Sequence, residues 1–222
     1  MENKLRLLIE FFVEKSFEYI IDKNTEVLFF FKKENDTKKC IQIEYREMEK
    51  KIRLGASVTE YIEVDSVEKI LEQITEKKTY FNYTLSGTVG VEKGGYLSSD
   101  CFFIKTENNL KRYIQLLDAY YKNHILPFFE AIPTLQSFND KVLSVVPFDE
   151  YHNYLSEEVG LKVMIIMLLC KNPLYKDYVL YREKDFENSP YLHNTDSRWH
   201  KLSKQSFEEF NKFKEMAEKG EI

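Results

Sequence analysis

The stretch CFFIKTENNLKRYIQLLDAYYKNHILPFFEAI, residues 101–132, decides the fold class, because a short apolar strand leads directly into the most regular helical pattern of the chain. The strand is predicted from Cys101 to Ile104, and the helix follows Thr106. One face of that helix is apolar and the other is polar. The apolar face comprises Leu110, Tyr113, Ile114, Leu117, Tyr120, Tyr121 and Ile125. A helix of this kind needs an apolar surface to lie on, and the preceding strands supply one.

The residues before this stretch predict an amphipathic helix followed by an antiparallel sheet. The helix is expected over residues 3–21. Residues 26–31 include three consecutive phenylalanines and predict a central strand buried on both faces, and a polar hairpin connection follows at 32–39. Residues 41–46 and 52–59 alternate between apolar and polar, which is typical of strands with one solvated face. Two further strands, at 80–85 and 101–105, bring the sheet to about five.

A further helix is predicted to begin at Asp65. Glu68 follows three residues later, in the pattern of a capping box, in which each side chain bonds the backbone amide of the other residue. Between this helix and the residue 101 strand lie Gly87, Gly90, Gly94 and Gly95. Their spacing matches neither a dinucleotide fingerprint nor a P-loop, and a strand follows them, so a hairpin or turn is the preferred interpretation over a phosphate cradle.

From Pro127 onward the sequence predicts helices throughout, over residues 134–143, 149–157, 161–170, 173–186 and 203–219. The predicted fold class is therefore α+β: an antiparallel sheet of about five strands packed against helices, followed by an all-helical C-terminal region. We expect an α+β domain at residues 1–143 and a helical extension or subdomain at 144–222 that packs on it.

Composition narrows the function classes. The net charge of −5 comes from 32 basic and 37 acidic residues in mixed clusters, so it gives no electrostatic footprint for nucleic acid. The three cysteines, Cys40, Cys101 and Cys170, have no paired spacing, so neither a disulfide framework nor a zinc knuckle is indicated, and a reducing compartment is favoured. Charged residues interrupt the N-terminal apolar residues, and the longest apolar run, 163–170, is short of a membrane span. We expect a cytoplasmic protein without a membrane role.

Two sets of residues are candidates for chemistry. His152 stands beside Asp149 and Glu150 at an expected helix start, where an imidazole near carboxylates suits a general base. The alternative is that Asp149 caps the helix and His152 is only hydrogen-bonded. His193, Asp196 and His200 combine two imidazoles with a carboxylate, a set that can hold a divalent metal ion. The alternative there is a polar surface loop.

The passage from strand Cys101–Lys105 through Thr106, Glu107 and Leu110 into a helix that ends Ile125-Leu126-Pro127-Phe128-Phe129-Glu130 resembles small uncharacterised bacterial α+β proteins. Some of these are thought to be immunity proteins of toxin systems. The resemblance covers roughly residues 1–143 and transfers no site residues. It implies a protein that acts by binding a partner.

Three functions follow as hypotheses. The first is a non-enzymatic protein-binding module, favoured by the absence of catalytic signatures and by the abundance of tyrosine, a residue enriched at interfaces. The second is a metal-dependent hydrolase that uses His193, Asp196 and His200. The third is a small-ligand sensor with a pocket between the sheet and the Tyr113 helix. No cofactor is predicted.

Overall fold

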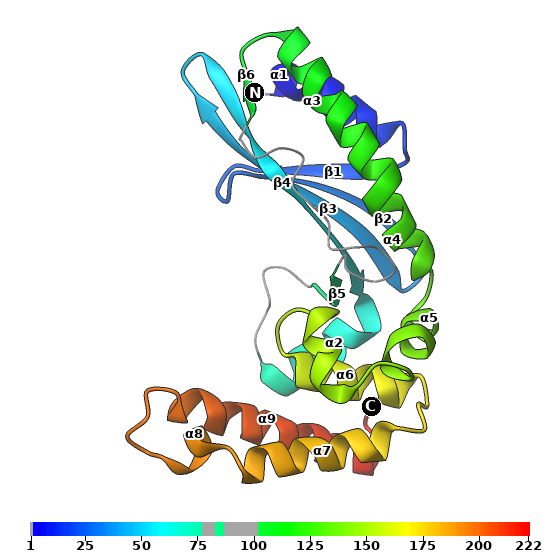
Figure 1. Ribbon diagram of the computed structural model, residues 1–222, viewed down its shortest axis with the longest axis vertical. Helices are drawn as coiled ribbons and strands as arrows, with labels where there is room; N and C mark the ends of the chain where they lie inside the picture. Colours follow the sequence, from blue (N-terminus) through cyan, green and yellow to red (C-terminus); the bar gives the residue numbers. More distant parts are fainter. Residues whose placement is uncertain (1, 77–82, 87–101) are drawn as a thin grey trace. The chain divides into compact units, whose positions relative to one another are not determined.

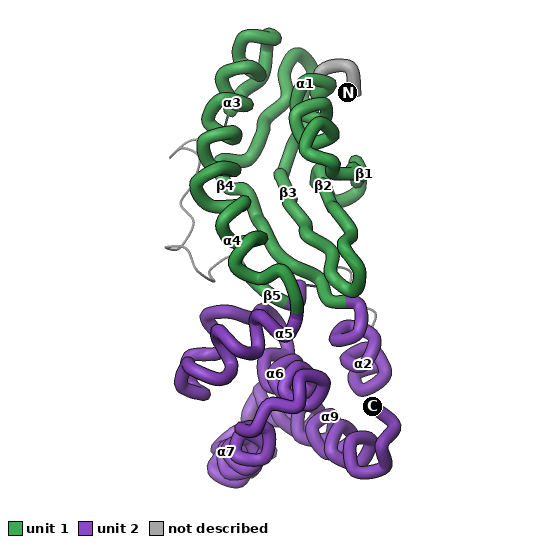
Figure 2. Tube along the Cα trace, turned by 90° about the vertical axis from the view of Figure 1, so that its right-hand side faces the viewer, with its two compact units in different colours: residues 1–64, 85–134 green, residues 65–84, 135–222 purple. Residues whose placement is uncertain are grey.

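A computed structural model gives the structure of residues 2–76, 83–86 and 102–222, with only the backbone of residues 2–4. The chain divides into two compact units (Figure 2). Unit 1 comprises residues 1–64 and 85–134, and unit 2 comprises residues 65–84 and 135–222. The sequence predicts one boundary, after residue 143, whereas in the structure the boundary follows residue 134 and the segment 65–84 also belongs with the C-terminal helices.

Unit 1 contains the predicted antiparallel sheet, which confirms the α+β class. Its strands run in the order β1-β2-β3-β4-β5, and β6 also pairs with β4. The strands are β1 (Glu18–Asp22), β2 (Val27–Glu34), β3 (Thr37–Met48), β4 (Lys51–Val64), β5 (Leu85–Ser86) and β6 (Phe102–Ile104). Strands β1 to β4 follow one another directly in sequence, so short turns suffice to connect them.

The β2–β3 hairpin shows how the sheet divides its two faces. Its turn is two residues long, and Asn35 adopts a positive φ of 57°, which asparagine tolerates better than most residues. Phe30 pairs with Ile41, and both are fully buried. Phe29 and Phe31 point to the opposite face and are only half-buried. The prediction that β2 is buried on both faces was wrong, because its side chains alternate between two unequally covered faces.

Helices cover one face of this sheet (Figure 1): α1 (Glu2–Val13), α3 (Glu107–Tyr120) and α4 (Leu126–Ala131), the last two joined by a π-helical turn, η1 (Tyr121–Ile125). The predicted helix over residues 3–21 was too long. Ser16 adopts a positive φ of 66°, which ends the helical path, and Glu18–Asp22 pairs with β2 instead. Backbone pairing along the sheet edge outweighs the helical pattern there.

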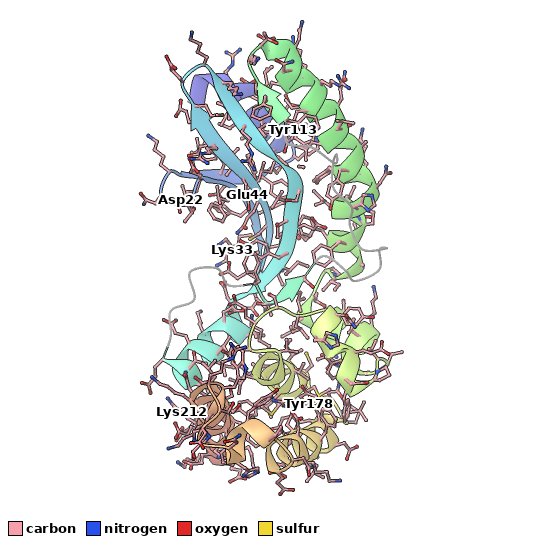
Figure 3. All side chains as sticks on the ribbon, turned by 60° about the vertical axis from the view of Figure 1, so that its left-hand side comes forward. Asp22, Lys33, Glu44, Tyr113, Tyr178 and Lys212 are labelled. Carbon is pink, nitrogen blue, oxygen red and sulfur yellow. The ribbon has the colours of Figure 1, made fainter. Side chains whose placement is uncertain are left out.

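Residues 102–120 form the predicted strand and helix, with β6 before Thr106 and α3 after it. Thr106 caps α3, and its hydroxyl accepts the amide hydrogen of Asn109 while Asn109 reaches back to the Thr106 amide. The buried face of α3 comprises Leu110, Tyr113, Leu117 and Tyr120. Tyr113 points from α3 towards the sheet (Figure 3), where its hydroxyl donates to the Gly55 carbonyl oxygen at 3.4 Å.

Aromatic rings form the contact between α1, the sheet and η1. Phe12 stacks on Phe30 with ring centroids 4.1 Å apart, and Phe17 and Tyr121 meet Phe12 edge-on. Ring pairs in these geometries contribute about 0.5–1.5 kcal/mol each beyond the area they bury. The core of unit 1 is therefore built from residues distant in sequence that share one face of the sheet.

Unit 2 is helical in all its described parts. Its first segment contributes α2 (Asp65–Thr75), and the second contributes α5 (Leu135–Phe138), the π-turn η2 (Asn139–Leu143), the 3-10 helix η3 (Phe148–Asn153), α6 (Val159–Leu169), α7 (Tyr175–Glu187), α8 (Pro190–His193) and α9 (His200–Lys219). The predicted helices agree with α5–η2, α6, α7 and α9. The helix expected over 149–157 is instead the shorter η3, and Glu157 and Glu158 beyond it adopt positive φ.

The predicted glycine hairpin lies outside the described residues, and so do residues 80–82 and 101 of two predicted strands. None of the described helices is both long enough and apolar enough to span a membrane.

Glu60 is an acidic residue in the interior of unit 1. It lies on the helix-facing side of β4, opposite Ile41, and is 8% exposed. The Tyr120 hydroxyl lies 3.4 and 3.5 Å from its two carboxylate oxygens, distances that mark weak hydrogen bonds. Burial raises the pKa of Glu60 from 4.5 to about 7, against hydrogen bonds that lower it. Between about pH 4.5 and pH 7, the folded protein therefore holds a proton on Glu60 that the unfolded chain releases.

The protonation of Glu60 makes the stability of the folded protein depend on pH. The stability that protonated Glu60 contributes is fully present below about pH 4.5 and is lost as the pH rises through 7, because the buried group then ionises. Glu60→Gln keeps the site neutral, so we expect it to stabilise the protein at pH 8 by about 1–3 kcal/mol and to change little at pH 4.5. Urea unfolding at the two pH values measures the difference.

Glu44→Gln is the matched control, since Glu44 is exposed on the neighbouring strand β3 (Figure 3). It should shift stability by less than about 0.5 kcal/mol at both pH values. An equal effect of Glu60→Gln at pH 4.5 and pH 8 would contradict the role given to Glu60.

Candidate functional site

The predicted metal ligands lie at the junction of α8 and α9, where both imidazoles bond to backbone carbonyls. His193 Nε2 is 2.8 Å from the Glu187 carbonyl oxygen, and His200 Nδ1 is 3.2 Å from that of Tyr191. A carbonyl oxygen only accepts, so each of these ring nitrogens donates its proton. Both histidines therefore act locally in holding the chain around α8.

Asp196 joins neither histidine in a ligand set. Its backbone amide donates to the Asn194 side chain at 3.1 Å, in the turn between α8 and α9. Throughout the described ranges, no three His, Cys, Asp or Glu side chains are grouped so that they could hold a metal ion. The three predicted ligands are close in sequence, but the structure does not group them into a metal site.

His152, the candidate general base, is exposed on η3. Its Nδ1 lies 2.6 Å from the backbone carbonyl oxygen of Asp149. The contact with Asp149 is therefore made through the backbone and not through the carboxylate that a base would need as its orienting partner. This geometry agrees with a hydrogen-bonded surface histidine. The predicted Asp149 cap was wrong, because Pro147 is the N-cap of η3 and no described side chain makes a cap hydrogen bond there.

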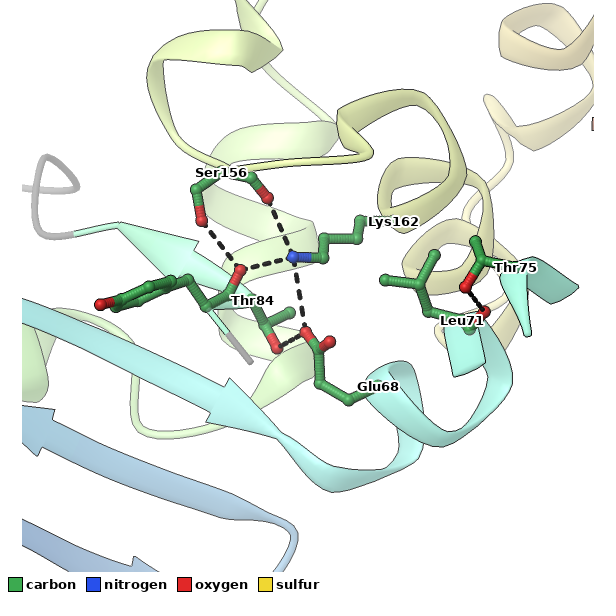
Figure 4. A network of polar contacts seen from close by, with 7 residues as sticks. Glu68, Leu71, Thr75, Thr84, Ser156 and Lys162 are labelled. Atoms are coloured by element: carbon green, nitrogen blue, oxygen red, sulfur yellow. Dashed lines mark hydrogen bonds and ion pairs between the residues drawn. The ribbon is translucent and has the colours of Figure 1, made fainter. Parts of the chain in front are cut away.

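A polar cluster of unit 2 surrounds a buried ammonium group (Figure 4). Lys162 on α6 is 2% exposed, and its Nζ donates to the carbonyl oxygens of Tyr83 at 2.5 Å and of Ser156 at 2.9 Å. Glu68 Oε1 on α2 lies 3.6 Å from the same nitrogen and accepts the Thr84 hydroxyl at 2.5 Å. The Ser156 hydroxyl completes the cluster by donating to the Tyr83 carbonyl oxygen at 2.9 Å.

The environment of Lys162 sets its chemical character. Burial lowers the pKa of the ammonium group, and the neighbouring carboxylate of Glu68 raises it in opposition. Polar contacts lie on three sides of Nζ, which leaves no open position from which it could attack a substrate. We therefore assign the cluster a structural role, which is to fasten residues 83–84, α2 and α6 to one another.

One atom of the cluster lacks a partner among the described residues: Glu68 Oε2, which is buried. The predicted capping box would have used the Glu68 carboxylate at the Asp65 amide. That part of the prediction was wrong, since Glu68 turns inward to Thr84 and Lys162. The sequence signal for this cluster was the single lysine in the otherwise apolar run of α6.

An open apolar groove of about 400 Å³ lies within unit 2, along α7 and α9. Its apolar lining comprises Leu168, Tyr175, Val179, Leu180 and Ala217. The Leu180 side chain is 54% exposed, whereas Tyr178 on the other side of α7 is 3% exposed and belongs to the core. Glu183 and Lys214 form an ion pair at the groove margin, and Lys176 and Glu218 provide its other charges.

A second group of exposed apolar residues lies where α8 meets α9. Tyr191, Trp199 and Leu202 are each about half exposed. The Arg198 guanidinium lies 4.8 Å from the Trp199 ring centroid, in cation–π contact. Tryptophan, tyrosine and arginine are the residues most enriched in the energetic centres of protein interfaces.

The chain matches no known family model, no curated protein and no solved structure.

Substitutions in the buried ion pair are expected to have large effects on stability that do not add. Lys162→Met or Glu68→Leu alone leaves the other charge buried without its partner, so we expect each to lower the free energy of unfolding by about 3–5 kcal/mol. The double variant removes both charges and should lose less than the sum of the two. Urea unfolding of the four proteins measures the coupling.

Lys212→Met is the matched control in the same unit. Lys212 bonds Glu76 at 2.8 Å, but both side chains are exposed, so its loss should change the free energy of unfolding by less than about 1 kcal/mol. Additive effects of the two buried substitutions would show that Lys162 and Glu68 are not coupled.

Proposed function

We propose that the protein is a non-enzymatic binding module that works in the cytoplasm by holding a helix of a second protein in the groove along α7 and α9. The groove itself is the observation that carries this proposal, because it exposes aliphatic side chains on a helical surface. Exposed apolar surface that is continuous and rimmed by charge is typical of interaction sites.

The lining favours a helical occupant. Tyr175, Val179 and Leu180 stand on one side of α7, and Ala217 faces the groove from α9. An amphipathic helix laid in such a groove presents apolar residues at positions i, i+3, i+4 and i+7. The margin adds a charge requirement: a partner helix with a carboxylate near Lys176 and a basic group near Glu218 is complementary to it.

Two further observations support a protein partner. The Tyr191, Trp199 and Arg198 surface at the α8–α9 junction has the composition of an interface centre. The net charge of −5 disfavours nucleic acid, and the resemblance at residues 101–130 to bacterial proteins thought to act as immunity proteins implies the same mode of action. Free Cys40 and Cys170 suit a reducing cytoplasm.

The test is native mass spectrometry of the full chain purified from lysate of the cells that naturally make it. We expect a second protein at stoichiometric ratio with the unsubstituted chain. Leu180→Asp places a carboxylate in the apolar groove, so we expect it to reduce the occupied fraction at least about tenfold. Leu180 is 54% exposed, so the variant keeps its fold.

Val145→Asp is the matched control, because Val145 is 73% exposed and does not line the groove. It should retain the partner. A partner that survives Leu180→Asp, or a dimer of this chain that Leu180→Asp dissociates, would overturn the proposal. So would a divalent ion that is lost on His200→Ala, a result that would favour the hydrolase.

A further inference from the structure

Unit 1 contains a separate cavity of about 180 Å³ at the start of α3. Three basic side chains from three places in the fold line it: Arg6 on α1, Lys50 in the turn between β3 and β4, and Lys105 between β6 and α3. Ile104 and Leu110, both buried, also line it. The cavity thus combines an apolar lining with cations that the fold brings together from distant parts of the sequence.

The three basic groups of this cavity outnumber the one acid in its lining, Glu107. Within the described part of the chain, neither Lys50 nor Lys105 has a carboxylate at ion-pair distance. Arg6 meets Glu10 only at 3.6 Å, and both side chains are at least half exposed, so solvent screens that contact. In a chain of net charge −5, this local excess of cations is unusual.

Glu107, the acid in the lining, offsets only part of this charge. It bonds Lys111 at 2.7 Å, and that lysine and, to a smaller extent, Arg6 lower the pKa of its carboxyl group. Thr106 is also engaged, because its hydroxyl bonds Asn109 in the cap of α3. The groups left to recognise a ligand are therefore the three cations, which mutually repel unless an anion lies between them.

We propose that this cavity binds the phosphate monoester group of a small soluble ligand. A phosphoryl dianion suits a cavity lined by several cations better than a carboxylate does, since it carries more charge and offers three acceptor oxygens. The Arg6 guanidinium can donate two parallel hydrogen bonds to such a group, while the lysines act as point charges. This site lies in unit 1 and is independent of the protein-binding groove of unit 2.

The probe is inorganic phosphate, titrated into the isotopically labelled full chain at pH 7.5 and followed by amide chemical shifts. We expect saturable shifts at residues 104–110 that sodium chloride and sodium acetate at the same ionic strength do not produce. Lys50→Gln/Lys105→Gln should raise the dissociation constant at least about tenfold, since each lost cation weakens the attraction for the dianion. Both lysines are exposed, so the fold is retained.

Lys23→Gln/Lys201→Gln is the control, with the same change of charge at two exposed lysines outside the cavity. It should leave the dissociation constant within about twofold. Arg6→Lys keeps the charge but loses the planar donor pair, and we expect it to weaken binding about threefold or more. Shifts without saturation, or equal weakening by the control pair, would overturn the site.

A second arm separates the two sources of a phosphate monoester. Vesicles of phosphatidylcholine with and without phosphatidate are sedimented with the protein. We expect no cosedimentation, as befits a soluble ligand. Phosphatidate-dependent sedimentation that Lys50→Gln/Lys105→Gln abolishes would overturn the soluble ligand and assign the cavity to a lipid headgroup.

Discussion

Burying the ammonium group of Lys162 requires that acceptors be present on every side of it, and the architecture of unit 2 meets that requirement with parts that are remote in sequence. Glu68 comes from α2, the carbonyl of Tyr83 from the segment after it, and the carbonyl of Ser156 from the loop before α6. An isolated buried charge is strongly unfavourable, so the three parts are bound to one arrangement. Apolar contacts alone would tolerate more than one packing of α2 on α6.

Unit 1 solves the opposite problem. Its interior is aromatic and aliphatic, with Phe12 stacked on Phe30 and Tyr113 fixed to the Gly55 carbonyl. Glu60, the buried carboxyl group among the described residues of unit 1, meets only a weak donor in Tyr120, and burial raises its pKa. Unit 2 therefore pairs the buried charge of Lys162, whereas in unit 1 the buried Glu60 is protonated below about pH 7.

Sequence periodicity was sufficient for the elements whose signal is local. The apolar face of α3 was evident from residues 106–125, and so were the alternation of β3 and most C-terminal helices. Sequence periodicity failed where contacts with residues distant in sequence determine the local structure. Nothing near Ser16 marks the end of α1, and the Asp65–Glu68 pattern does not reveal that Lys162 competes for the glutamate. Residue type alone likewise suggested a metal site at His193 and His200, whose protons go to backbone carbonyls.

The division of the chain has a consequence for its synthesis. Unit 2 is assembled from residues 65–84 and 135–222, with part of unit 1 made between them. As the chain leaves the ribosome, α2 emerges early, yet the lysine that Glu68 requires is translated only after α3 and α4. Domains tend to fold in the order in which they are made, but unit 2 can complete its fold only after the intervening part of unit 1 has been synthesised. Because its two segments are separated in the sequence, expressing unit 2 alone requires that residues 65–84 be fused to residues 135–222.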